Sequence, residues 1–233
     1  MHDPLTDFEW GSLYRRYDAL CKGYDSGSHC LARFGSARPD SDRELYYRLI
    51  SCYLPAARTA DRDVIGTYQA LLYWKLYSTA GSRGTNILAW LKPGSAGRRS
   101  AESTLPRWLS RLPPSLNRNE SDVVEKVREM PLIRGMGTEC RLPVRTTFLH
   151  FLYPSVVPIF DRNVLLAVGV NEKNANQSYD RLREYLPFAW ELADRYCVQS
   201  AMCNREESLR RIDMALWVTR GSRKHRIAGQ EQE

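Results

Sequence analysis

The sequence lacks any apolar run long enough to span a bilayer, and this absence excludes a membrane-spanning helix. Its first residues also lack the basic stretch and following apolar stretch that mark a secretory signal peptide. We therefore expect a cytoplasmic protein that does not act at a membrane.

Cysteines in metal-ligand clusters are also missing. The six cysteines are scattered along the chain, at positions 21, 30, 52, 140, 197 and 203. An iron–sulfur cluster needs four closely spaced thiolates, whereas Cys197 and Cys203 form a single pair. Cys21, His29 and Cys30 lack the second ligand pair of a zinc site. We expect reduced thiols, no metal and no cofactor.

Internal repeats and the period-two alternation of strands are absent as well, and apolar residues recur at helical spacing instead. The sequence therefore predicts an all-α protein, with an N-terminal helix and loop (1–40), a helical domain (41–220) and a disordered tail (221–233). Helices are expected over 8–22, 41–55, 61–79, 85–91, 103–112, 121–130, 141–152, 161–168, 178–198 and 205–219.

Several local signals support these boundaries. Ser41 and Ser121 are candidate N-caps, and Glu44 would complete a capping box with Ser41. Residues 61–79 carry apolar side chains on almost every side, which indicates a buried central helix. Residues 93–101 form a basic stretch rich in glycine and serine, for which we expect a loop.

The charge balance is basic. The formal net charge is +7 and the isoelectric point is about 9.2. Lysine and arginine side chains release counterions when they bind phosphates, so this balance favours a polyanionic partner. Many basic proteins bind no nucleic acid, and charge alone leaves the partner open.

The segment 131–169 carries the chemistry. It reads as a turn around Gly135 and Gly137, a helix, a proline-containing connector, and then Asp161 at the head of another helix. Backbone N–H groups at such a turn can bind a DNA phosphate, although an ordinary helix–helix turn uses the same glycines. Asp161 is a preferred helix N-cap residue, and capping does not exclude a catalytic role.

This arrangement resembles the helix-hairpin-helix DNA glycosylases. The stretch TTFLHFLYPSVVPIFDRNV and the later LRRIDMALW are similar to bacterial proteins grouped with the 8-oxoguanine glycosylase fold. The resemblance covers roughly residues 120–217. It implies two helical subdomains with a cleft between them, and Asp161 as the carboxylate that stabilises an oxocarbenium-like sugar.

The resemblance also has a gap. Glycosylases that cleave the DNA strand carry a lysine near the start of the helix after the hairpin, and no lysine lies between Lys126 and Lys173. The interval from Gly137 to Asp161 is also slightly longer than in the usual pattern. An enzyme of this kind should be monofunctional, so that it releases a base and leaves an abasic site.

Further residues have two interpretations each. Arg141 and Arg145 could contact DNA phosphates or remain solvated helix charges. A base pocket could draw on Gln69, Tyr73 and Trp74, and on the neighbouring Tyr68 and Lys75, but aromatic side chains at helical spacing are more often core. His150 is better explained as a core histidine bonded to the backbone.

Two further charged features also have two interpretations. Arg210 and Asp213 are spaced to pair on a helix surface, which is the favoured interpretation, and the alternative is that Asp213 lines the site. The basic stretch from Lys92 to Arg99 could touch the DNA backbone or remain a solvated loop.

The favoured function is a monofunctional, monomeric DNA glycosylase that flips a base out of duplex DNA and excises it. The target could be an oxidised purine, an alkylated base, a mismatched pyrimidine, or a bulky modified cytosine of phage DNA, the last in antiviral defence. One alternative is a DNA- or nucleotide-binding module without catalysis. Another is an unrelated helical interaction protein.

Overall fold

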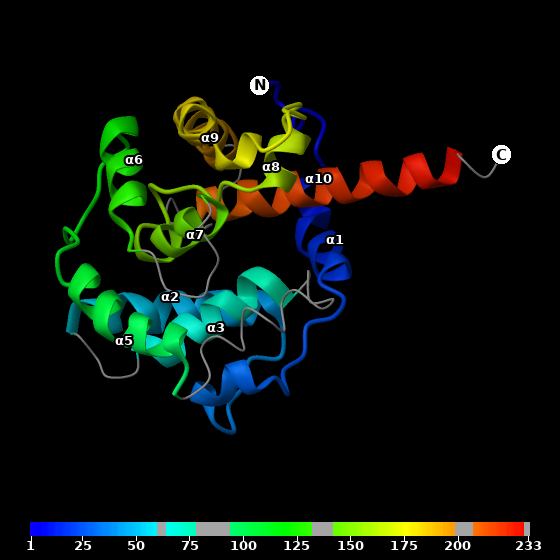
Figure 1. Ribbon diagram of the computed structural model, residues 1–233. Coiled ribbons are helices and arrows are strands. Elements are labelled where there is room, and N and C mark those ends of the chain that lie inside the picture. Colours follow the sequence, from blue (N-terminus) through cyan, green and yellow to red (C-terminus); the bar gives the residue numbers. More distant parts are fainter. Residues whose placement is uncertain (60–63, 78–93, 132–141, 199–206, 231–233) are drawn as a thin grey trace.

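The computed structural model describes residues 1–59, 64–77, 94–131, 142–198 and 207–230 (Figure 1). Within these ranges the regular structure is helical, which confirms the predicted all-α class. The α-helices are α1 (Leu13–Leu20), α2 (Asp42–Thr59), α3 (Val64–Leu76), α5 (Ala96–Leu109), α6 (Glu120–Glu129), α7 (Leu142–Leu152), α8 (Arg162–Ala167), α9 (Tyr179–Val198) and α10 (Ser208–Gln230). Short 3₁₀ helices are η1 (Trp10–Ser12), η2 (His29–Phe34) and η4 (Ala175–Gln177).

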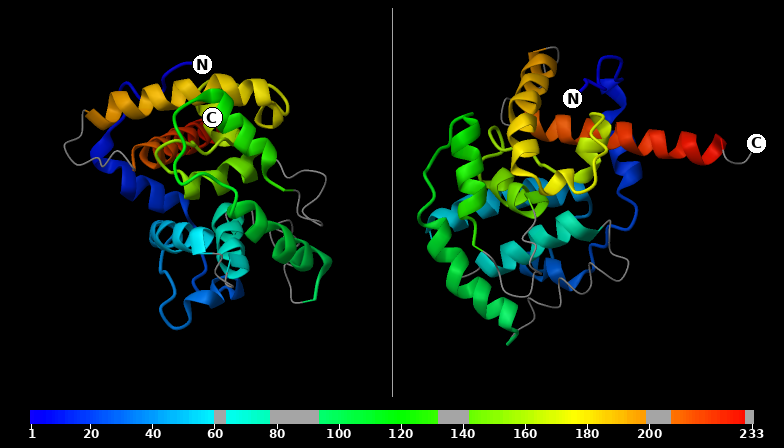
Figure 2. Two further views of the ribbon diagram at one scale, coloured as in Figure 1. Left: turned by 90° about the vertical axis from the view of Figure 1, so that its left-hand side faces the viewer. Right: turned by 45° about the horizontal axis from the view of Figure 1, so that its top comes forward.

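The helices lie in two groups. α2, α3 and α5 lie on one side, and α6, α8, α9 and α10 lie on the other, with α7 between them (Figure 1). α7 contacts α2 and α3 as well as α6, so it joins the two groups. The two further views show the same separation (Figure 2).

The core is continuous across this arrangement. Along α3, Val64, Tyr68 and Leu72 are buried together with residues on its other faces, as the all-round apolar pattern predicts. Tyr68 packs against Phe148 of α7, with ring centroids 4.4 Å apart. Burial of aromatic side chains of this size is a large part of what holds the helices together.

The N-terminal segment is packed onto the domain. The His2 N–H donates to the Val168 carbonyl at the end of α8, and Asp3 accepts hydrogen bonds from Arg195 and Tyr196 of α9. α1 packs against α10. The sequence predicts a helix and a loop for residues 1–40. The structure adds that this segment packs against α8, α9 and α10.

The caps agree with the sequence in part. The Ser41 hydroxyl accepts the Glu44 N–H at 3.2 Å, as predicted, and the Glu44 carboxylate reaches back to the Asp40 N–H at 2.7 Å. The predicted cap at Ser121 is wrong. Asn119 caps α6 instead, because its extended backbone lets the side-chain oxygen accept the Asp122 N–H.

Two predicted irregular segments are helical. α5 begins at Ala96, inside the predicted loop, because Ser95 caps it by accepting the Arg98 N–H and Arg98 pairs with Glu102 one turn later. α10 continues to Gln230, through most of the predicted tail. The added turns contain no proline, and extending an existing helix is cheaper than starting one, which offsets the low helix propensity of Gly221 and Gly229.

Several predictions lie outside the described residues. They are the turn with Gly135 and Gly137, the adjacent Arg141, and the short helix over 85–91.

Candidate functional site

Asp161 is the N-cap of α8, as its sequence context predicts. Its extended backbone turns the carboxylate toward the helix, where Oδ1 accepts the N–H groups of Asn163 at 2.8 Å and Val164 at 3.2 Å. The other oxygen, Oδ2, is left for a partner from elsewhere in the chain. The cap therefore orients the carboxylate without using all of it.

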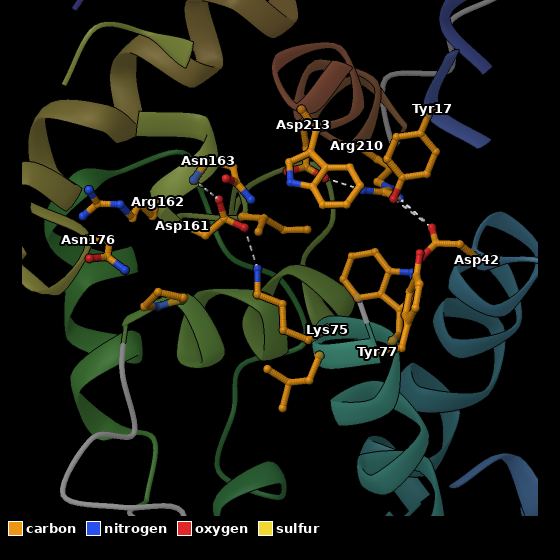
Figure 3. Close-up of a pocket in the computed structure, with 15 residues that line it drawn as sticks. Tyr17, Asp42, Lys75, Tyr77, Asp161, Arg162, Asn163, Asn176, Arg210 and Asp213 are labelled. Atoms are coloured by element: carbon orange, nitrogen blue, oxygen red, sulfur yellow. Dashed lines mark hydrogen bonds and ion pairs between the residues drawn. The ribbon is translucent and has the colours of Figure 1, made fainter. Parts of the chain in front are cut away.

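That partner is Lys75. Its ammonium group, on the last turn of α3, donates to Asp161 Oδ2 at 2.9 Å (Figure 3). The two side chains are only 12% and 19% exposed, so water screens the pair weakly. No sequence pattern links these positions, because they belong to opposite groups of helices.

The three donors decide the charge of Asp161. Burial by itself would raise the pKa of this carboxyl group. Lys75 and the N–H groups of Val164 and Asn163 outweigh burial and hold the pKa below its usual value. Asp161 is therefore an ionised carboxylate at neutral pH.

Asp161 and Lys75 line a cavity of about 230 Å³ where the two groups of helices meet. Figure 3 shows residues of this cavity arriving from several helices. Aromatic rings and polar or charged groups share the lining, which is the mixed character of ligand sites. The lining residues are Tyr17, Asp42, Trp74, Lys75, Leu76, Tyr77, Pro143, Ile159, Asp161, Arg162, Asn163, Asn176, Arg210, Asp213 and Trp217.

A buried charged cluster forms another part of the lining. Arg210 donates to Asp213, to the Tyr17 hydroxyl at 2.6 Å and to Asp42 Oδ2 at 3.2 Å. Tyr17 in turn donates to Asp42 at 2.8 Å. Arg210 and Asp213 pair as their spacing predicts, but the pair is buried and not on the helix surface. Asp213 lines the cavity, which is the alternative that the sequence left open.

Aromatic faces surround the same guanidinium group. The Arg210 guanidinium lies 4.8 Å from the ring centre of Tyr46 and 4.9 Å from those of Tyr17 and Trp74. These cation–π contacts stabilise a buried charge. The buried Trp74 Nε1 has no hydrogen-bond partner among the described residues, which is uncommon for a buried N–H group.

The predicted base-pocket residues of α3 differ in whether they reach the cavity. Trp74 lines the cavity, whereas Gln69 and Tyr73 do not. The Tyr73 hydroxyl instead accepts the Asp25 N–H at 2.7 Å and donates to the Asp25 carbonyl at 3.0 Å. Tyr73 therefore helps to hold the N-terminal segment, and its role in a base pocket stays a prediction.

The Arg145 side chain forms hydrogen bonds within the protein. Its Nη1 donates to the carbonyls of Val127 and Arg128 at the end of α6 and to the Tyr179 hydroxyl. It does not line the cavity. A DNA contact of Arg145 stays a prediction, and it would have to compete with these bonds.

His150 is a core residue, as predicted. Its side chain is fully buried, and Nδ1 lies 2.7 Å from the Val157 carbonyl, which can only accept a hydrogen bond. Nδ1 therefore carries the proton, and Nε2 accepts from the Tyr46 hydroxyl at 2.7 Å. Burial lowers the pKa of His150 to about 3, so it is neutral over the physiological range.

Sequence reasoning missed most of the cavity lining. It counted Lys75 among the possible base-pocket residues but gave it no partner, and it assigned no role to Tyr17, Asp42 or Trp217. The available signal was a lysine at the end of an otherwise apolar helix, because a charge in that position needs a buried partner.

Comparisons of the chain with known protein families, with characterised proteins and with experimentally solved structures found no match. Among the described residues, none of the helices combines the length and the apolar character that a bilayer crossing requires.

Proposed function

We propose that this protein is a DNA N-glycosylase that accepts a flipped base in the cavity and hydrolyses its bond to the sugar. One observation carries the proposal. An ionised carboxylate, Asp161, is fixed by three donors at the wall of a cavity lined by aromatic and polar groups. The resemblance of residues 120–217 to helix-hairpin-helix glycosylases points to the same residue.

The chemistry needs such a carboxylate. Breaking an N-glycosidic bond leaves positive charge on the sugar, and a nearby ionised carboxylate stabilises that charge as it develops. The same group can orient a water molecule toward the anomeric carbon. Because Asp161 is already held by Lys75, Asn163 and Val164, little reorganisation is needed when the charge appears.

The size of the cavity favours a single base. Sites for drug-sized ligands have volumes of roughly 300–1,000 Å³, and this cavity, at about 230 Å³, falls just below that range. Trp74, Tyr77 and Trp217 supply aromatic surface, which binds an extruded base by stacking. Duplex DNA remains the proposed partner, and the protein would act as a monomer.

Lys75 raises a second candidate activity. Its amine lies beside the candidate catalytic carboxylate although the hairpin region has no lysine. A neutral amine there could attack the sugar and lead to strand cleavage. In the structure, however, the Lys75 amine forms an ion pair with Asp161, and an amine in such a pair has no free electron pair for attack. We therefore keep the monofunctional reaction as the proposal.

The test incubates the protein with duplexes that contain oxidised, alkylated, deaminated or glucosylated hydroxymethyl bases, and with phage DNA that carries modified cytosines. Base loss is read as strand breaks after alkali and with an aldehyde-reactive probe. We expect alkali-dependent breaks in the wild type that are absent in Asp161→Asn. Asp180→Asn is the matched control, because this side chain is 86% exposed and does not line the cavity.

The other outcomes are equally informative. Breaks without alkali, together with a borohydride-trapped protein–DNA adduct that Lys75→Arg abolishes, would assign the strand-cleaving reaction. Tight DNA binding without base loss on any substrate would replace the enzyme with a binding module. Negligible binding at moderate salt would favour a protein that does not act on DNA.

A further inference from the structure

The cluster around Arg210 holds more acid than base. Asp42 and Asp213 share one guanidinium group, and the side chains of Arg210 and Asp42 are each only 3% exposed. Arginine does not lose its proton in proteins, so full ionisation would leave one uncompensated negative charge in a buried site. Burying such a charge is costly, and a carboxyl group in this position tends to retain a proton instead.

Asp213 is the member of the cluster that can exchange that proton with a ligand. Its side chain is 11% exposed, and the residue lines the cavity. Within the described part of the chain, Arg210 engages only its Oδ2 atom. Asp42 also lines the cavity, but its side chain is only 3% exposed and its Oδ2 already accepts from both Tyr17 and Arg210.

The neighbours of Asp213 act in opposite directions. Burial raises the pKa of this carboxyl group, Arg210 and Lys75 lower it, and the charge of Asp161 raises it, so that the resulting pKa is about 6. The surrounding tyrosines, Tyr17 on α1, Tyr46 on α2 and Tyr185 on α9, have pKa values raised by burial and stay neutral. The charged groups that face Asp213 are therefore Arg210 on α10, Asp42 on α2, Lys75 on α3 and Asp161 at the start of α8.

One cavity thus contains two carboxyl groups in opposite environments. Asp161 is surrounded by donors and ionised, whereas Asp213 is desolvated and shares its cation with another acid. Enzymes that use a pair of carboxyl groups assign the acid and the stabilising roles by this kind of difference.

We infer that Asp213 is a second catalytic residue of the cavity, a general acid that protonates the departing base while Asp161 stabilises the sugar. This inference rests on the proposed N-glycosylase function. It also narrows the substrate to a neutral base, because a base that is already cationic after alkylation leaves without a proton donor.

The step balances as a hydrolysis. The bond between the anomeric carbon and the base nitrogen breaks, and its electron pair stays on the base, which takes the proton of the Asp213 carboxyl group. Water adds to the anomeric carbon and gives a proton to the Asp161 carboxylate, which passes it to solvent. Asp213 regains a proton from solvent, so the net change is base plus abasic sugar from one water molecule.

The test measures single-turnover base release between pH 5 and pH 8, on the duplex that the wild type processes best and on a duplex with cationic 7-methylguanine. For the neutral base we expect the wild-type rate to fall about tenfold per pH unit above pH 6, since only protonated Asp213 acts. Asp213→Asn should lose about 10²–10⁴-fold on this base and keep a flat pH profile. Its rate on 7-methylguanine should stay within a few-fold of the wild-type rate.

Asp213→Glu, which keeps a carboxyl group, should recover part of the rate together with its dependence on pH. An Asp213→Asn variant with the wild-type rate and pH profile would overturn the assignment and leave the glycosylase proposal intact. So would a wild-type rate that stays constant between pH 6 and pH 8, which needs no variant to fold. A wild type that releases no base from any duplex would overturn both proposals.

Discussion

At the scale of single residues, the chemistry of the cavity depends on which donors each of its carboxyl groups accepts hydrogen bonds from. Asp161 accepts from one side chain and two backbone groups, and Asp213 accepts from a guanidinium that it shares. Both aspartates can be read from the sequence. Their pKa values differ because their hydrogen-bond partners differ, and only the folded chain brings these partners together.

Lys75 should control the acid limb of activity. Lys75→Met removes the strongest influence that lowers the pKa of Asp161, and burial then raises this pKa. An opposite charge at this range shifts a carboxyl pKa by about 1–3 units, so we expect the acid-side midpoint of the base-release rate to rise by about one unit or more. Lys75→Arg keeps the charge and should keep the midpoint near its wild-type position. An unchanged midpoint in Lys75→Met would contradict the pairing.

His150 should make the fold sensitive to acid. Its pKa is about 3 in the folded protein and near 6.5 when unfolded, so the unfolded chain binds the extra proton between these values. The free energy of unfolding should therefore fall by about 1.4 kcal/mol per pH unit as the pH drops below 6.5. Urea unfolding of the wild type and of His150→Gln at pH 7, 5.5 and 4.5 measures this. The variant should lack this part of the slope, and equal slopes would show that His150 does not titrate on unfolding.

At the scale of elements, α8 is a short helix whose cap is the candidate catalytic residue. Asp161→Asn keeps a good N-cap side chain, whereas Asp161→Ala removes the bonds to Asn163 and Val164. Both variants also remove the carboxylate that pairs with Lys75, so the difference between them reports the cap, and we expect Asp161→Ala to lose about 1 kcal/mol more stability than Asp161→Asn. Both variants should lose base release, because neither has a carboxylate. Chemical denaturation beside the base-release assay separates capping from catalysis, and activity in the Asn variant would leave Asp161 with the capping role alone.

The elements also show what the sequence could predict. Periodicity predicted α3, α7 and α9 well, because apolar spacing is a local property. Asp161 at the start of α8 followed from its local context in the same way. The pairing of Lys75 with Asp161 did not, since it depends on how α3 and α8 meet across the molecule. The spacing of Arg210 and Asp213 predicted their contact, but burial of the pair depends on α1 and α2, which cover it.

At the scale of the whole molecule, Tyr17 ties the first α-helix to the centre. Its hydroxyl donates to Asp42 on α2 and accepts from Arg210 on α10. Tyr17→Phe removes both bonds and leaves buried charged groups short of partners, so we expect a loss of about 1–3 kcal/mol. Tyr47→Phe is the matched control, because Tyr47 is 38% exposed and should change stability little. Thermal unfolding of both variants and the wild type checks this. Equal midpoints for Tyr17→Phe and the wild type would show that the two hydrogen bonds of the Tyr17 hydroxyl do not stabilise the fold.

The long α10 helix has a consequence for how the protein is made. Arg210, Asp213 and Trp217 all come from α10, while Tyr17 and Asp42 precede this helix by more than 160 residues and are synthesised well before it. Tyr17 and Asp42 therefore have no guanidinium partner until α10, which carries Arg210, has left the ribosome. A nascent chain that stops before this helix has a candidate carboxylate at Asp161 but no complete cavity. The proposed activity would then begin only after α10 has been synthesised, which keeps chains that lack this helix from attacking DNA.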